Sequence, residues 1–150
     1  MKIECLILAD AAQAVAGKLF ILGGGWNLYR AQNYPVNIQL ALGIDLSFSR
    51  NEAGAKYPLT LVVADDAGVP IVPQINGVID VVPPADELPK GALIKLPLAF
   101  NTVLQIPRVG RYVIVVTAGS SKAQTSFDAI FTGNKVDLTS GGTGDLERGN

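Results

Sequence analysis

One segment of the chain alternates large apolar side chains with small or polar ones. From Val36 to Phe48, every second residue is a large aliphatic or aromatic one. Successive side chains of a β-strand point to opposite faces, so this spacing places all the large side chains on one face. In a helix the same residues would be spread around the whole circumference. The segment therefore predicts a long strand with one buried face.

Shorter segments with the same alternation occur along most of the chain. We expect eight strands, or nine if residues 26–30 also form one, and place the other seven at residues 2–9, 18–23, 57–64, 75–82, 93–100, 111–118 and 123–131. Residues 10–16 alone have some helical character, enough for one optional turn of helix.

The connections between these segments favour an antiparallel arrangement. Residues 50–54, 65–68, 107–110 and 119–122 are rich in Gly, Asp, Asn, Ser and Pro, as hairpin turns are. A longer loop at 83–91 holds three prolines and is expected to cross between sheets. Short strands with such links predict an all-β fold, a two-sheet antiparallel β-sandwich of immunoglobulin-like or C2-like type.

Two residue types refine this prediction. Prolines lack the amide donor of an interior strand position, so the segments around Pro58, Pro70, Pro73 and Pro97 should be edges, bulges or strand ends. Tyr112 opens a strand after a turn, where immunoglobulin-like sandwiches carry a tyrosine that ties down a crossing loop. The other interpretation of Tyr112 is a strand aromatic whose ring lies in the core.

The alternation decays after Phe131. Residues 132–150 are rich in Gly and Thr and nearly free of large apolar residues. We therefore divide the chain into a β-sandwich domain at 1–131 and a C-terminal tail at 132–150, which is either a flexible linker or a segment held against a neighbouring subunit.

The charge content narrows the choice of partners. Charged residues make up 17% of the chain and hydrophobic ones 49%, whereas an average protein has about 25% charged residues. So neutral a surface predicts that part of it is covered by self-association. Because the basic residues do not cluster, nucleic acid is not an expected partner. No apolar run is long enough to span a bilayer or to form a signal peptide, and the single cysteine, Cys5, fits a reducing compartment, so we expect no membrane association and a cytoplasmic location.

Candidate chemistry is sparse. The chain has no histidine, which removes the commonest general base and transition-metal ligand, and Cys5 lies in an apolar strand without an activating base nearby in sequence. The pairs Asp65-Asp66 and Asp86-Glu87 suit solvated turns better than a calcium loop. We therefore predict no catalytic residues, no metal site and no cofactor, and a protein that is not an enzyme.

The block Gly23-Gly24-Gly25-Trp26 is the most distinctive in the chain. It lacks the Gly-Lys-Ser/Thr of a phosphate-binding loop, so we interpret it as a bend that needs positive φ angles or close backbone approach. Trp26 then closes the end of the core. The alternative is that Trp26, Tyr29 and Tyr34 form an exposed aromatic platform for a sugar or a peptide.

Several blocks in this order resemble a known family. They are Ala9-Asp10-Ala11-Ala12 followed by residues 17–26, then residues 96–101, and then Pro107 with Gly110-Arg111-Tyr112. Together they are similar to a family of small uncharacterised bacterial proteins, catalogued as a domain of unknown function. The resemblance implies a compact β-sandwich and carries over no catalytic residue.

Two functions follow as hypotheses. The first is a non-enzymatic structural or interaction protein that self-associates into a homo-oligomer or larger assembly through apolar surface and open sheet edges. The second is a monomeric binding module that uses loops at one end of the sandwich, with Trp26, Tyr29, Tyr34 and the Asp65-Asp66 turn as contacts for carbohydrate, peptide or calcium.

Overall fold

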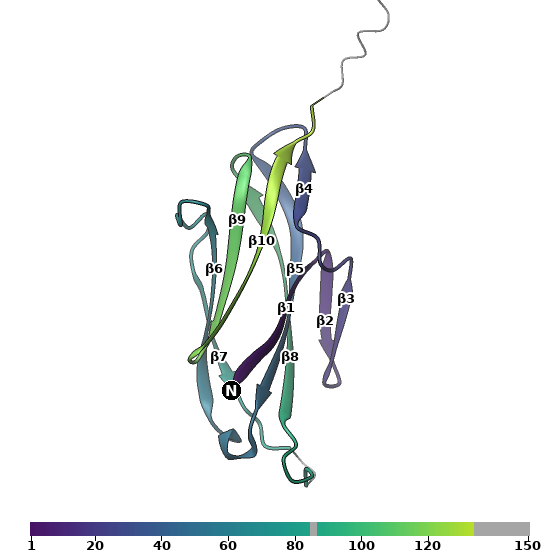
Figure 1. Ribbon diagram of the computed structural model, residues 1–150, viewed down its shortest axis with the longest axis vertical. Helices are drawn as coiled ribbons and strands as arrows, with labels where there is room; N and C mark the ends of the chain where they lie inside the picture. The colour runs from purple at the N-terminus through teal and green to yellow at the C-terminus, as the bar shows by residue number, and fades with distance from the viewer. Residues whose placement is uncertain (85–86, 134–150) are drawn as a thin grey trace, which may run out of the picture.

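The regular secondary structure of the described residues is β-strand, apart from one 3-10 turn. A computed structural model describes residues 1–84 and 87–133 (Figure 1). In chain order the elements are β1 (Lys2–Ala9), β2 (Ala11–Val15), β3 (Lys18–Leu22), β4 (Leu28–Ala31), β5 (Val36–Phe48), the 3-10 turn η1 (Arg50–Glu52), β6 (Lys56–Asp65), β7 (Ile75–Asp80), β8 (Ile94–Ile106), β9 (Gly110–Ala118) and β10 (Ser121–Phe131).

These ten strands are one more than the largest number expected. The additional strand is β2, so the prediction of a helical turn at residues 10–16 was wrong. The short strand expected at residues 26–30 exists as β4. Most of the predicted tail, from residue 134 onward, lies outside the described residues.

Two sheets stack face to face, as predicted for a β-sandwich (Figure 1). One has the strand order β1-β5-β8 and the other β4-β10-β9-β6-β7. Every pairing within them is antiparallel except that of β4 with β10, which is parallel and departs from the all-antiparallel prediction. The core between the sheets contains large side chains from both of them, among them Leu8, Ile38, Leu40, Leu42, Leu46, Phe48, Val63, Ile106, Tyr112, Ile114 and Phe127.

The strand with the strongest alternation lies at the centre of the smaller sheet. β5 has the bounds that the sequence predicts, and its large side chains face the core. Ala41 and Gly43 on its other face are buried as well. An additional layer therefore covers the outer face of this sheet.

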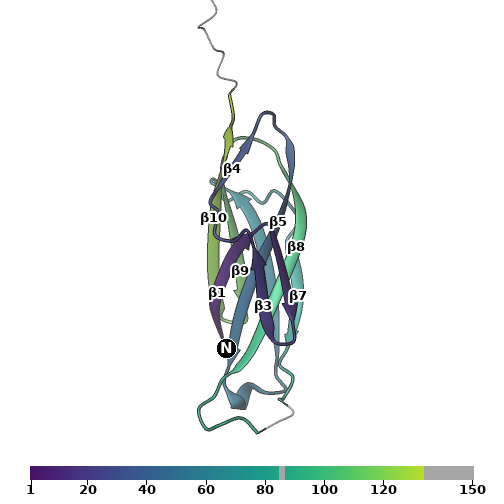
Figure 2. The ribbon, with the colours of Figure 1, turned by 90° about the vertical axis from the view of Figure 1, so that its right-hand side faces the viewer.

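That layer is the hairpin formed by β2 and β3 (Figure 2). A Cβ atom built on Gly43 would lie 2.2 Å from Cδ1 of Ile21, so this hairpin sits directly on the central strand. Asn101 of β8 holds it from the side, because its side-chain amide donates to the carbonyl of Ala12 (2.9 Å) and accepts from the N–H of Ala12 (3.1 Å). The pair imitates a short piece of β-ladder.

Two of the four links predicted to be hairpins connect different sheets instead. Residues 50–54 and 107–110 join strands of different sheets, so interpreting them as hairpins was wrong. The links at 65–68 and 119–122 begin connections between antiparallel neighbours, as expected. The loop at 83–91 connects β7 of one sheet with β8 of the other, which confirms the predicted crossing.

The prolines partly follow the prediction. Pro97 lies on β8, an edge strand. Pro58 lies on β6, between β9 and β7, but its carbonyl accepts the N–H of Gly119 (2.8 Å) just beyond the end of β9. Its missing donor therefore faces the end of a ladder, where no strand pairing is lost.

Candidate functional site

The three aromatic residues proposed as a binding platform lie on β4 and in the segments on either side of it. Trp26, Tyr29 and Tyr34 are all half-buried and pack against the core. The Trp26 ring meets Phe127 edge-on at 5.5 Å between ring centroids, and the indole Nε1 is buried without an acceptor among the described residues. Part of the ring thus closes the end of the core, as the sequence suggests.

Tyr34 also has a structural contact. Its hydroxyl donates to the carbonyl of Ile130 on β10 at 2.8 Å. Burial raises the pKa of this phenol, and the nearby hydroxyls of Tyr112 and Tyr29 raise it further. Tyr34 and Tyr29 are therefore neighbours in space. Each ring is partly buried against the core, so only its exposed part could contact a ligand.

The glycine block before Trp26 is a close-packed bend. Gly23 and Gly25 have φ angles of 61° and 85°. A Cβ atom on Gly24 would lie 2.5 Å from Cγ2 of Ile21 and 3.1 Å from Cγ2 of Ile7. The N–H of Gly25 donates to the carbonyl of Leu8 at 2.7 Å, which ties the bend to β1. Both expected reasons for glycine, positive φ and close approach, are confirmed.

Tyr112 satisfies both interpretations that the sequence left open. Its ring is buried and stacks on Phe127 at 5.5 Å between centroids. Its hydroxyl donates to the carbonyl of Arg108, four residues upstream, at 2.8 Å. The residue therefore packs in the core and ties down the connection from β8 to β9.

The carboxylate of Asp65 is engaged in structural contacts. It accepts the backbone N–H groups of Val69 (2.9 Å) and Ala67 (3.1 Å) and pairs with the guanidinium of Arg108 at 2.8 Å. The Val69 N–H is the main cause of its lowered pKa. This supports interpreting Asp65 as a turn residue.

Among residues 1–84 and 87–133, no three His, Cys, Asp or Glu side chains are grouped so that they could hold a metal ion. Asp86 lies outside these ranges.

The same part of the chain also contains no helix with the length and apolar character that crossing a membrane requires.

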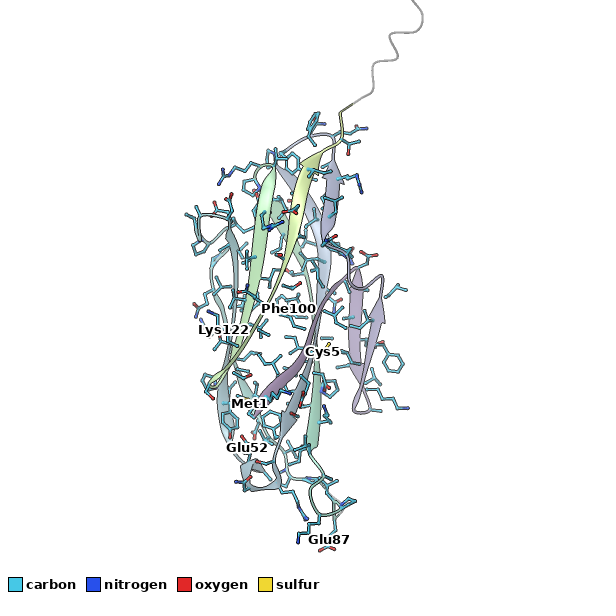
Figure 3. All side chains as sticks on the ribbon, viewed as in Figure 1. Met1, Cys5, Glu52, Glu87, Phe100 and Lys122 are labelled. Atoms are coloured by element: carbon cyan, nitrogen blue, oxygen red, sulfur yellow. The ribbon has the colours of Figure 1, made fainter. Side chains whose placement is uncertain are left out.

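A partly buried ionic cluster joins Met1 and Glu52 near the end of the molecule that carries η1 (Figure 3). The Glu52 carboxylate binds the amino-terminal ammonium group of Met1, the backbone N–H and hydroxyl of Ser49, and the hydroxyl of Tyr57. These donors, the ammonium group first, lower the pKa of Glu52 to about 2. The cluster fastens β1 to the turn between the two sheets.

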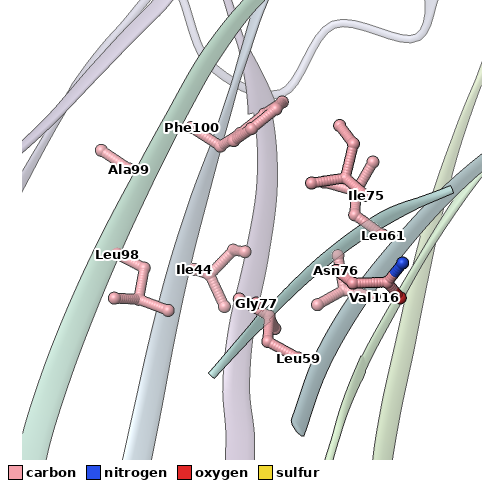
Figure 4. Close-up of a pocket in the computed structure, with 10 residues that line it drawn as sticks. All are labelled: Ile44, Leu59, Leu61, Ile75, Asn76, Gly77, Leu98, Ala99, Phe100 and Val116. Atoms are coloured by element: carbon pink, nitrogen blue, oxygen red, sulfur yellow. The ribbon is translucent and has the colours of Figure 1, made fainter. Parts of the chain in front are cut away.

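One side of the sandwich contains an apolar cavity of about 200 Å³ (Figure 4). It lies between the edge strands β7 and β8, and its floor is made of core residues of both sheets. Its lining consists of Ile44, Leu59, Leu61, Ile75, Asn76, Gly77, Leu98, Ala99, Phe100 and Val116. The sequence did not predict this cavity, because the pairing of distant segments decides which strands lie at an edge.

Eleven large apolar side chains are exposed among the described residues, and six of them lie in two groups. On the outward face of the β2–β3 hairpin these are Val15, Phe20 and Leu22. On and after β7 they are Ile75, Val78 and Val82, of which Val78 is 70% and Val82 71% exposed. The low charge of the sequence indicated such surface but not its position.

The sequence was compared with known protein families, curated proteins and solved structures. Residues 4–128 match the model of a family of unknown function, DUF6941, and the chain belongs to that family. This agrees with the expectation that the chain belongs to an uncharacterised family, catalogued as a domain of unknown function. No match was found among curated proteins or among solved structures.

Proposed function

We propose that this protein is a non-enzymatic structural or interaction protein whose β-sandwich self-associates. The observation that carries the proposal is the amount of apolar side chain left in water on both sheets and on the hairpin. Leu22 and Val78 are each 70% exposed, and Val103 on β8 is 63% exposed. On the hairpin, Val15, Phe20 and Leu22 share one exposed face, and apolar side chains grouped in this way on a surface of low charge are typical of interaction sites.

The polar groups support the non-enzymatic part of the proposal. Asp65 and Glu52 use their oxygens on backbone N–H groups and on fixed cations or hydroxyls. Asp128 forms a two-pronged pair with Arg111 at 2.8 and 2.9 Å, which lowers the pKa of Asp128. The shifted pKa values of these carboxylates therefore follow from contacts that hold the fold together. From the composition, we also propose a cytoplasmic location.

We further propose that the sandwich is immunoglobulin-like. Two observations favour this over the C2-like alternative. The first is the strand order β1-β5-β8 stacked on β4-β10-β9-β6-β7, in which an early strand runs parallel to the last one. The second is the bond from the Tyr112 hydroxyl to Arg108, which has the form of a tyrosine corner.

Light scattering on the full chain after size-exclusion chromatography tests self-association. A mass that is a multiple of 15.7 kDa at micromolar concentration, and that falls on dilution, is the expected result. A mass of 15.7 kDa throughout would instead favour the monomeric loop-based module with Trp26, Tyr29 and Tyr34.

A further inference from the structure

The outer edge of β7 has unpaired backbone groups. β7 is the last strand of the five-stranded sheet and pairs with β6 alone. The carbonyl of Pro58 points to Gly119, on the side of β6 away from β7, so the pair Pro58–Val78 is not hydrogen-bonded. The N–H and C=O of Val78 therefore point outward, and so do those of Asn76, two residues earlier.

Other edges of the sandwich and the hairpin have features that discourage pairing. β1 has Lys2 and Glu4, β8 has Lys95 and Pro97, and β4 is only four residues long. The outer backbone groups of Ala12 on β2 are occupied by Asn101. Lysine, proline and short length are the devices by which proteins protect open edges. β7 has no charge and no proline from Ile75 to Ile79.

The apolar cavity opens beside this same edge. Ile75 and Gly77 belong to its lining, and Ile75 is 37% exposed (Figure 4). A strand added to β7 would place its own inward side chains beside the mouth of the cavity, facing β8. Such an added strand would satisfy the backbone and cover the apolar lining together.

We propose that β7 pairs antiparallel with β7 of a second copy, with a two-fold axis at Gly77. This inference rests on the proposed self-association and names its surface. In this register Asn76 of each copy lies opposite Val78 of the other, so the two residues with outward N–H and C=O groups bond each other. The carbonyl of Asp80 already accepts the N–H of Val82, so we expect the ladder between the two copies to end before Asp80.

The side chains suit this symmetric register. Ile75 of one copy lies opposite Ile79 of the other on the inward face, and apolar cross-strand pairs are favourable. Asp80 lies opposite Gln74, so the two copies do not bring their acidic side chains directly together. A Cβ atom built on Gly77 would have no neighbour nearer than 3.9 Å within its own copy, so a side chain introduced at the axis fits without displacing that copy's atoms.

Cross-linking tests this geometry directly. In a Cys5→Ser background, Gly77→Cys places two thiols opposite each other in a non-hydrogen-bonded pair, within the Cα distance that a disulfide spans. We expect mild oxidation to give a covalent dimer of Gly77→Cys. The matched control is Val103→Cys, at an exposed position on β8, which should stay uncross-linked.

A second variant tests the edge without cysteine. Val78→Pro removes an outward N–H and no bond to β6, so it should leave the fold intact and shift the oligomer toward monomer at least tenfold in dissociation constant. Circular dichroism checks the fold. The β7 surface would be overturned if the wild-type chain is oligomeric but Gly77→Cys does not cross-link and Val78→Pro does not dissociate the oligomer. Self-association itself would then still stand. A monomeric wild-type chain would overturn both.

Discussion

At the scale of single residues, hydroxyl and carboxylate groups hold the connections between sheets. The bond from Tyr112 to Arg108 fixes the connection from β8 to β9, and the Glu52 cluster fixes η1 and β1. Both act at chain crossings, where no β-ladder satisfies the backbone.

The contribution of the Tyr112 hydroxyl can be separated from that of its ring. We expect Tyr112→Phe to lower the free energy of unfolding by about 0.5–1.5 kcal/mol, because one hydrogen bond is lost and the ring stays. Tyr112→Ala should cost about 3–5 kcal/mol, because a fully buried ring is removed. Urea unfolding measures both, and an equal loss in the two variants would contradict this division.

Glu52 makes stability depend on pH. Its pKa is about 2 in the folded protein and 4.5 in an unconstrained chain, so its contribution is complete above pH 4.5 and is lost as the pH falls toward 2. Glu52→Gln should be less stable than the wild-type chain at pH 7, and the difference should shrink between pH 4.5 and 2. Asp66→Asn, in an exposed turn, is the control in the same unfolding series. A difference that is constant with pH would refute the assignment.

At the scale of elements, the β2–β3 hairpin shows where sequence reasoning stops. β5 is predicted to the residue because its large side chains alternate without interruption. β2 is missed because Ala11–Val15 has mostly small side chains and its alternation is weak. The turn is also hidden: Ala16 and Gly17 have φ angles of 50° and 71°, but Ala-Gly is not the usual Asn-Gly or Asp-Gly signal.

A double-mutant cycle can test whether this hairpin packs directly on Gly43. A Cβ atom on Gly43 would lie 2.2 Å from Cδ1 of Ile21, which is the atom that Ile21→Val removes. We expect Gly43→Ala to cost about 1–3 kcal/mol and Ile21→Val about 0.5–1.5 kcal/mol. The double variant should cost less than their sum, because Ile21→Val relieves the overlap. Additive losses in thermal or urea unfolding would show that the hairpin does not sit on Gly43.

At the scale of the whole molecule, the sequence predicts the all-β class and the stacked sheets but not the order of strands. Alternation shows that a segment has a buried face, whereas the partner of each segment depends on contacts between residues far apart in the chain. Both β7 and β8 were predicted as strands, and Pro97 favoured an edge, a bulge or a strand end for the second of them, but nothing in the sequence showed that the two edges lie beside one cavity. The candidate interaction surface therefore appears only with the pairing.

The same limit applies to the aromatic residues. Trp26 was predicted to close the core or to form a platform with Tyr29 and Tyr34, and the structure places all three partly in the core. Six of the eleven exposed large apolar side chains lie elsewhere, on the hairpin and on or just after β7. Low charge in a composition therefore indicates that covered surface exists, and the fold decides where it lies.

Sedimentation equilibrium of the full chain over a dilution series tests the central claim most directly. The account predicts a mass of twice 15.7 kDa at micromolar concentration for the wild-type chain and of 15.7 kDa for Val78→Pro. A wild-type mass of 15.7 kDa at every concentration would contradict it.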